Sequence, residues 1–425
     1  MSALDNRTGR HRYRGTDAQA GAVRGHGHGH GPVRPASYRV RMLLIAVLAP
    51  VALVTLIGLW LTWPGDAPRS NVDVGFGQRP VQGQVLATTS APCTSGTAAE
   101  AGGSAPAGQA KECISLSVLL TNGDSPGVMI QQLLPDEPST PRFTVGDRVV
   151  LAYTGGNPSE AESYQIQDFQ RGTSMLWLVA LFAAAVLLLG RWRGLASLVA
   201  LGFSFLVLAI YLFPAILAGG NPLMIGVLAA SVIMFGVLYL THGVSAQTSS
   251  AVLGTVLSLG LIGVLGAAFS ATTRLTGLDD DTGKLIGVLG HGIDARGLLL
   301  AGMVIGALGV LDDVTVTQTS AVWELRRANP ELGVRALYTA ALRIGRDHVS
   351  SAVNTLALAY TGAALPVLLI FSLSGQGFGT MITTQDIAQE VVRTLVGSIG
   401  LVAAVPITTA IAALVAQHDD IESAT

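Results

Sequence analysis

The chain has 425 residues, of which 50% are apolar and only 12% are charged, and its formal net charge is −2. Average soluble domains carry about 25% charged residues, so the composition excludes an ordinary soluble protein. A nearly neutral net charge gives no electrostatic reason for nucleic-acid binding, and we expect no nucleic-acid partner. Two cysteines are too few for a disulfide-rich scaffold.

Residues 1–39 form a basic tail with almost no aliphatic side chains, which predicts a disordered segment. His26, His28 and His30 alternate with glycine in this tail. Three histidines on such a segment can bind Zn²⁺ or Ni²⁺ weakly, and low-complexity drift is the alternative explanation. We treat the three histidines as weak metal-binding candidates and expect no cofactor.

Eight apolar segments are long enough to cross a bilayer, whose hydrocarbon core of about 30 Å needs roughly 20 mainly apolar helical residues. They are residues 40–63, 174–190, 195–217, 222–241, 248–272, 297–323, 349–373 and 387–415. The first is longer than the apolar part of a signal peptide and lacks a small-residue cleavage site after it, which predicts an uncleaved anchor. The other seven predict a seven-helix transmembrane domain over residues 174–416, followed by a tail, residues 417–425.

The positions of the arginines predict the orientation, because short loops rich in Lys and Arg stay in the cytoplasm. With eight spans and a cytoplasmic N-terminus, 15 arginines fall on one side, in the N-terminal tail and in the loops after the second and sixth spans. The acidic loop at residues 279–281 and the segment 64–173 then fall on the other side. We therefore expect both termini to be cytoplasmic.

Residues 64–173 predict a small extracytoplasmic all-β domain. Five short runs with strand character, residues 81–88, 114–121, 127–134, 148–153 and 164–169, are separated by turn signals such as Asn122-Gly123-Asp124. Five such strands favour an OB-like or SH3-like barrel. Cys93 and Cys113 bracket a Gly/Ala/Ser-rich insert and can form a disulfide on the oxidising side of a membrane, the alternative being two unpaired small residues.

The sixth span is the most informative, because an ionised carboxylate near the bilayer centre costs roughly 2.5 to 3.5 kcal/mol even on translocon scales. It contains Asp312 and Asp313, about 22 to 24 Å into the helix. One helical face carries a stripe of small and polar residues: Gly302, Gly306, Gly309, Asp313, Thr317, Ser320 and Glu324. The small residues permit close contact with another helix, and the polar residues further along the face offer the ligands that a buried cation or proton site needs. Asp312 points about 100° away, towards Thr315 and Thr319.

The seventh span carries a matching stripe that includes Asn354. The two stripes predict a substrate- or ion-binding site at Asp313, Thr317, Ser320 and Asn354. The alternative is that Asp313 bonds Asn354 or pairs with an arginine of the loop between the spans, and so only fixes the packing of helices. Residues 284–296, before the sixth span, contain an apolar run too short to cross and predict an interfacial or re-entrant piece.

Motifs of soluble enzymes are missing from the sequence, which has no P-loop, no GxSxG and no HExxH. An intramembrane aspartyl protease needs aspartates on two spans, and here Asp347 would have to be drawn in from the edge of the membrane. We therefore expect no enzyme activity and no catalytic residues.

Three stretches resemble the YibE/F-like family of bacterial multi-pass membrane proteins: residues 306–320, Gly345-Arg-Asp-His348 with residues 353–360 and 365–366, and residues 392–400 with 405–406. The resemblance implies an anchor, a small β domain and a seven-span body in a bacterial plasma membrane. It matches the aspartate of the family to Asp313, with hydroxyls at Thr317 and Ser320, whereas Asp312 stands where many relatives have an apolar residue. It implies no biochemical activity.

Two functions follow from these observations. As a transporter or permease, the chain would move a small ion or solute past Asp313 and its neighbours, using protonation or cation binding at the carboxylate. As a non-transporting scaffold or sensor, it would bind a ligand or an envelope protein with its β domain. Besides the lipid bilayer, the sequence leaves a homo-oligomer or an envelope protein as partners.

Overall fold

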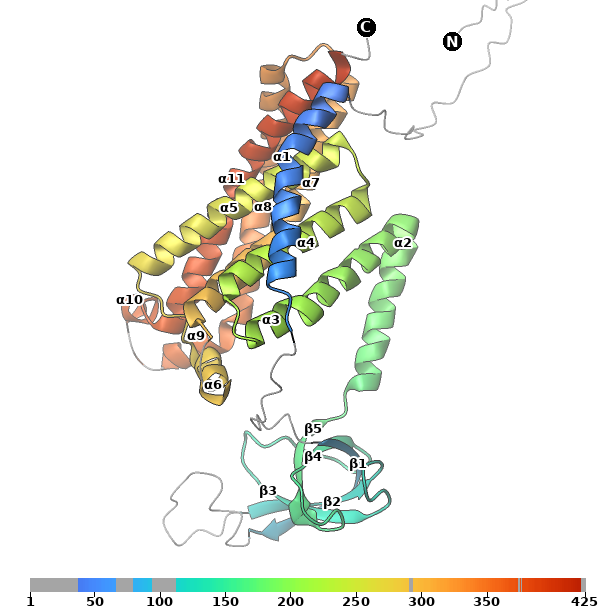
Figure 1. The fold of residues 1–425 in the computed structure, drawn as a ribbon. Helices are drawn as coiled ribbons and strands as arrows, with labels where there is room; N and C mark the ends of the chain where they lie inside the picture. The colour runs from blue at the N-terminus through green and yellow to red at the C-terminus, as the bar shows by residue number, and fades with distance from the viewer. Residues whose placement is uncertain are drawn as a thin grey trace, which may run out of the picture. The chain divides into compact units, whose positions relative to one another are not determined.

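The computed structural model describes residues 37–65, 79–93, 112–289, 293–373, 375 and 377–421. His26, His28 and His30 and most of the insert between the two cysteines lie outside these residues. Figure 1 shows a helical body and a separate small sheet. The strands are β1 (Arg79–Pro92), β2 (Glu112–Leu120), β3 (Met129–Pro135), β4 (Arg148–Tyr153) and β5 (Tyr164–Phe169), with a 3₁₀ turn, η1 (Ala161–Ser163), before β5.

The helices follow the anchor-then-body order that the sequence predicts. They are α1 (Tyr38–Leu61), α2 (Gly172–Val207), the π-helical turn η2 (Leu208–Leu212), α3 (Phe213–Leu217), α4 (Pro222–His242), α5 (Ala246–Thr272), α6 (Asp280–Leu289), α7 (Ala295–Ala328), α8 (Val334–Ala363), α9 (Leu365–Leu373), α10 (Phe378–Met381) and α11 (Gln385–Ile421). The helix α6 occupies the start of the short apolar piece expected before the sixth span, and its ten residues are too few to cross a bilayer.

The five strands form one antiparallel sheet in the order β3-β2-β1-β4-β5. The central strand β1 pairs with β4 through its first half and with β2 through most of its length. Its register with β2 shifts between Val85 and Ala87, and a bulge of this kind bends a strand. Val85, Leu116 and Leu151 are fully buried on the concave side. The expected antiparallel strands are therefore confirmed, and they form a half-barrel.

A side chain joins the two edge strands of this half-barrel. No backbone ladder pairs β3 with β5 in the described part of the chain, but Gln132 on β3 donates from Nε2 to two carbonyl oxygens across the gap. The acceptors are Ala161, at 2.6 Å, and Tyr164, at 2.9 Å. Gln132 therefore ties β3 to the start of β5.

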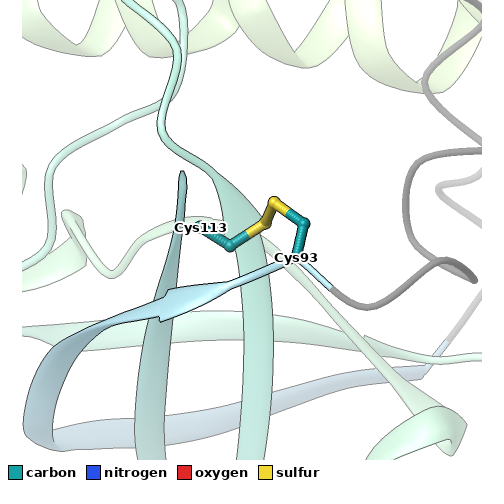
Figure 2. The surroundings of a disulfide bond; sticks show 2 residues. All are labelled: Cys93 and Cys113. Carbon is teal, nitrogen blue, oxygen red and sulfur yellow. A yellow bond between two sulfur atoms is a disulfide. The ribbon is translucent and has the colours of Figure 1, made fainter. Parts of the chain in front are cut away.

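Cys93 and Cys113 are joined by a disulfide, with their Cα atoms 5.2 Å apart and a sequence separation of 20 residues (Figure 2). Cys113 lies on β2 and pairs in the ladder with Ala91 near the end of β1. Because Cys93 follows that strand directly, the β1–β2 pairing brings the two sulfur atoms together. The bond closes the chain around the insert.

Six helical segments in the described part of the chain are long and apolar enough to cross a membrane. They are Tyr38–Leu61, Gly172–Leu217, Pro222–His242, Ala246–Thr272, Ala295–Ala328 and Gln385–His418. They confirm a body of several membrane-type helices. The expected count of eight is not reproduced, because two expected spans fall in one helical run and the expected seventh is divided between two helices.

The run Gly172–Leu217 contains 46 residues and would extend about 69 Å if it were straight. It is interrupted at Arg191, whose φ of 50° and ψ of −124° are not helical. Figure 1 shows α2 as two straight segments that meet at a sharp bend. A Cβ added to Gly194 would overlap the carbonyl oxygen of Val186, eight residues earlier, whereas a straight helix separates such residues by about 12 Å. The chain therefore turns back at the bend.

The segment expected to form the seventh span, residues 349–373, is divided. Its first part is the end of α8, which stops at Ala363, and its second part is α9, which holds nine residues. Pro366 is the second residue of α9, where its missing N–H costs nothing because the first turn of a helix has no acceptor for it. The pyrrolidine ring of Pro366 would clash with the preceding turn of a continuous helix, so α8 does not continue into α9 without a break.

The helical core is centred on α5, α7 and α11, which bury a cluster of aliphatic side chains that includes Ile262, Leu311 and Val396. Close approach depends on Gly400 of α11, because a Cβ there would overlap the side chain of Ile262 on α5. These helices provide the rigid frame against which α8 lies.

Both ends of the helical body meet at one place. Ser37, which caps α1, donates its hydroxyl to the carbonyl oxygen of His418 near the end of α11, at 3.4 Å. A buried apolar cluster joins the start of α1 (Val40) to the end of α7 (Trp323) and the start of α8 (Leu337). The beginning of α1, the end of α7, the beginning of α8 and the end of α11 therefore lie at the same end of the body.

Candidate functional site

The two aspartates of α7 lie on different faces of the helix. The side chain of Asp313 is 75% exposed, whereas Oδ1 of Asp312 is buried and has no hydrogen-bond partner among the described residues. Gly302, Gly306 and Gly309, which share the face of Asp313, are also exposed. In the single chain this stripe therefore lies on the exposed side of α7, and not in the interior where a buried cation or proton site would lie.

The physical reason lies in the residues of the opposite face. That face carries the buried side chains Met303, Val304, Leu308, Leu311 and Val314. Burying apolar area is favourable by about 25 cal/mol per Å², so aliphatic side chains gain far more from the interior than glycine does. Small residues permit close contact, but they do not determine which face is turned inward.

Asp313 does have a partner on the neighbouring helix. Its Oδ2 lies 3.7 Å from Nε2 of His348 on α8, and the His348 side chain is 39% exposed. The Nε2 atom itself is buried and has no hydrogen-bond partner among the described residues. A carboxylate and an imidazole therefore face one another across the contact between α7 and α8. We call them the Asp313–His348 pair.

Gln318 holds α8 in the position that forms this pair. The Gln318 side chain is buried on α7 and donates from Nε2 to the carbonyl oxygen of Ala341 on α8, at 2.9 Å. Gly345 of α8 lies directly against Gln318, because a Cβ added there would come within 2.5 Å of its Oε1. His348 follows Gly345 by about one helical turn, so the contact between Gln318 and Gly345 fixes the position of His348 along α8, beside Asp313.

The other predicted site residues do not gather around Asp313. Thr317 and Asn354 are exposed, and Ser320 is half-buried and accepts a hydrogen bond from Nε2 of Gln247 at 2.9 Å. In the described part of the chain, no hydrogen bond joins Asp313 to Asn354. No ion pair there joins Asp313 to Arg343 or Arg346, so the packing role considered from the sequence has no contact to support it.

A buried polar cluster lies on the inner side of α7, and we call it the threonine cluster. Thr255 of α5 and Thr315 of α7 are fully buried, with their hydroxyls 2.9 Å apart. The Thr408 hydroxyl of α11 is buried without a partner in the described residues and packs against Gly254. Asp312 lies about one turn from Thr315, so the three central helices meet around polar groups.

A pocket of about 570 Å³ lies at the opposite end of α11 from His418. Its walls come from the loop before α6, the end of α8, the start of α9 and the first turns of α11. The polar residues that line it are Asp279, Tyr360, Thr361, Asp386, Glu390, Arg393 and Thr394. We call it the Tyr360 pocket.

The Tyr360 pocket contains an ion pair within a membrane-type helix. Arg393 donates from Nη1 to Oε1 of Glu390 at 2.6 Å, and its Nε atom is buried without a partner in the described part of the chain. Tyr360 connects the pocket to α7, because a Cβ added to Gly306 would lie 3.1 Å from the Tyr360 hydroxyl.

Sequence reasoning did not single out His348, Tyr360, Glu390 and Arg393. His348, Tyr360 and Arg393 lie inside stretches that carry the family resemblance, and Glu390 and Arg393 are charged residues within an expected span. Those signals were available. The contacts of these four residues with the rest of the site depend on how α7, α8 and α11 pack, and local sequence spacing does not predict that packing. Within the described residues, no group of three or more His, Cys, Asp or Glu side chains is placed to hold a metal ion.

Comparison with known proteins gives one result. A search of curated proteins and a search of solved structures returned no match. A family model described as YibE/F-like protein matches residues 178–418, which include the Asp313–His348 pair, the threonine cluster and every residue that lines the Tyr360 pocket. Because the match covers more than half of the chain, this protein belongs to the YibE/F-like family.

Proposed function

We propose that this protein is a membrane permease that moves a small ion or solute and uses the Asp313–His348 pair to bind and release a proton. The observation that carries the proposal is the 3.7 Å approach of a carboxylate and an imidazole from two neighbouring helices. Asp313 lies 18 residues, or about 27 Å, from the start of α7, which is deep within a membrane-type helix. Ionisable residues at such depth mark ion pathways and proton relays.

The glycine-bearing face of α7 supports a pathway from the Tyr360 pocket to this pair. Tyr360 lines the pocket and also packs over Gly306 of α7. From Gly306, Asp313 is seven residues, or about 10 Å, further along the helix. Gly309 lies between them with open space beside it, since no atom lies within 4 Å of a Cβ added there. A solute that enters the Tyr360 pocket therefore has the open, exposed face of α7 to follow towards Asp313.

We further propose that the helical body crosses the membrane eight times, with both termini in the cytoplasm of a bacterial cell. The reversal at Arg191 divides the 46-residue run into two crossings, and α8 with α9 supplies another. The hydrogen bond from Ser37 to His418 supports termini on one side. The arginine-bearing ends of α7 and α8 lie at that same end of the body, as the positive-inside rule requires.

For the β domain we propose an OB-like rather than an SH3-like fold on the extracytoplasmic side. In an OB-fold β1 pairs with both β2 and β4, β3 extends from β2, and the barrel closes between β3 and β5. This sheet has the β1–β2, β1–β4 and β2–β3 pairings of an OB-fold. Gln132 bonds β3 to the start of β5, where an OB-fold closes its barrel. OB-folds are partly open five-stranded barrels.

The alternative function is a non-transporting scaffold or sensor that binds a ligand or an envelope protein through the β domain. The exposed side chains of Met129 and Val145 are the features of the domain that favour it, at 61% and 65% exposure. Single exposed apolar residues are common on protein surfaces, so this observation weighs less than a titratable pair inside the membrane region.

The test is transport by the purified full chain in liposomes, measured with a panel of ions and small solutes and a trapped pH-sensitive dye. We expect a flux that Asp313→Asn abolishes and that His348→Gln lowers at least about tenfold, because proton transfer by a positioned group contributes roughly 10²-fold or more. Glu324→Gln is the matched control, since Glu324 is an exposed carboxylate on the same face of α7. Absence of flux across the panel with folded wild-type protein would favour the scaffold.

A further inference from the structure

The Tyr360 pocket is larger than an ion needs. Its volume of about 570 Å³ falls in the range of sites for small organic molecules, roughly 300 to 1,000 Å³, and a single water occupies about 30 Å³. Apolar side chains, including Val367, Leu368 and Ile387, form much of its wall. Such a wall suits the hydrocarbon part of a ligand and leaves a few polar groups to orient the rest.

Arg393 supplies a site for a negatively charged group. A guanidinium has five N–H donors, and the contact with Glu390 uses one nitrogen, Nη1. The buried Nε has no acceptor among the described residues, and an unsatisfied buried donor is unfavourable because it has lost its hydrogen bond to water. Guanidinium groups bind carboxylates through two parallel hydrogen bonds. A ligand carboxylate would supply the missing acceptor.

The remaining charges of the pocket favour a positive group. Among the described residues that line it, the carboxylates of Asp279 and Glu390 outnumber the guanidinium of Arg393. A purely anionic ligand would meet an excess of carboxylates, and a purely cationic one would leave Nε of Arg393 without an acceptor. Only a ligand with both charges satisfies the two observations together.

We propose that the Tyr360 pocket binds a small zwitterion, an α-amino acid or a dipeptide, with its carboxylate on Arg393 and its ammonium group towards the acidic residues. The hydrocarbon side chain of the ligand contacts the apolar wall. This site deepens the proposed permease function by naming its substrate class, and the step from binding to transport rests on that function. The binding itself is measured without transport.

The experiment is calorimetric titration of the full chain in nanodiscs with leucine and with alanyl-leucine. Leucine amide, which lacks the carboxylate, and N-acetyl-leucine, which lacks the ammonium group, are the matched ligands. We expect saturable binding of at least one zwitterion and affinities roughly tenfold or more lower for both blocked ligands, as the loss of a charged hydrogen bond predicts. Equal affinity for a zwitterion and either of its blocked relatives would overturn the proposal, as would no binding of any ligand.

Variants locate the binding. Glu390→Gln with Arg393→Gln removes both members of the pair, so neither charge is left alone, and should abolish binding. Glu324→Gln with Arg327→Gln is the matched control, because these residues form another Glu–Arg pair three residues apart and are outside the pocket. Zwitterion binding that survives the first double substitution would contradict the site.

A second variant separates loss of binding from loss of folding. Ala363→Phe fills the pocket from an exposed position at the end of α8 without changing any charge, and it should also abolish binding while the melting temperature stays that of the wild type. Unchanged binding in this variant would overturn the proposal. Zwitterion binding without any flux would support the binding site and contradict the permease function. Zwitterion flux that neither pocket variant changes would contradict the binding site alone.

Discussion

Asp313 on α7 and His348 on α8 approach to 3.7 Å across a contact that Gln318 holds in place. The pair lies on the exposed side of α7 in the single chain, and the aliphatic face of the same helix forms the core. The proposed proton site and the apolar core therefore lie on different faces of one helix. Substitutions on the two faces should have separable effects.

The first prediction concerns that separation. Asp313→Asn should change the free energy of unfolding by no more than about 0.5 kcal/mol, because the side chain is 75% exposed and makes no hydrogen bond in the described structure. Gln318→Leu should cost about 1 to 1.5 kcal/mol, since it removes a buried hydrogen bond between α7 and α8. Thermal unfolding in detergent measures both. An Asp313→Asn protein that melts as early as Gln318→Leu would assign Asp313 a structural role.

The second prediction concerns the reversal in α2. Gly194→Val should prevent the two segments of α2 from meeting, because even a Cβ at this position overlaps the backbone of Val186. We expect poor expression or early unfolding. Gly202→Val is the control on the same helix, where no atom lies within 4 Å of an added Cβ. Equal stability of the two variants would show that the turn at Arg191 is not required.

The third prediction concerns the disulfide. The bond between Cys93 and Cys113 closes a loop of 20 residues, which in the chain-entropy model stabilises the domain by roughly 3 kcal/mol. Mass spectrometry of the unreduced protein should find the two cysteines linked. Cys93→Ser with Cys113→Ser should lower the unfolding temperature of the β domain. Two free thiols in protein isolated from the membrane would contradict the predicted compartment of this domain.

The fourth prediction concerns topology. Ser159, in the exposed turn before β5, replaced by cysteine should react with a membrane-impermeant maleimide in intact cells. Tags placed before residue 1 and after residue 425 should be accessible only after lysis, since Ser37 and His418 lie at one end of the body. Labelling of Ser159→Cys only after lysis, or tags on opposite sides, would refute the proposed arrangement of spans.

Much of the fold could be predicted from local patterns. Alternating strand residues and turn signals located the five strands, and cysteines on either side of an insert indicated their bond. The apolar runs located the membrane-type helices, but not the continuity through Arg191 or the break before Pro366. Both depend on single residues at the ends of apolar segments, where composition alone does not distinguish a loop from a bend.

The site could be predicted only in part. Helical spacing placed Asp312 and Asp313 on different faces of α7. Which face is buried depends on the packing of Leu308, Leu311 and Val314 against apolar side chains of other helices, and helical spacing does not predict that packing. The approach of His348 to Asp313 is a contact between two helices and has no local signal. The Tyr360 pocket combines residues from around positions 279, 360 and 390, which only the tertiary structure brings together.

The most direct test of the central claim is the simultaneous measurement of solute and proton entry into liposomes that contain the full chain. The account predicts that an inward pH gradient drives uptake of the solute identified in the panel and that protons enter with it. In Asp313→Asn, both movements should stop while the protein remains folded. Solute uptake in the Asp313→Asn variant at the wild-type rate would contradict the account.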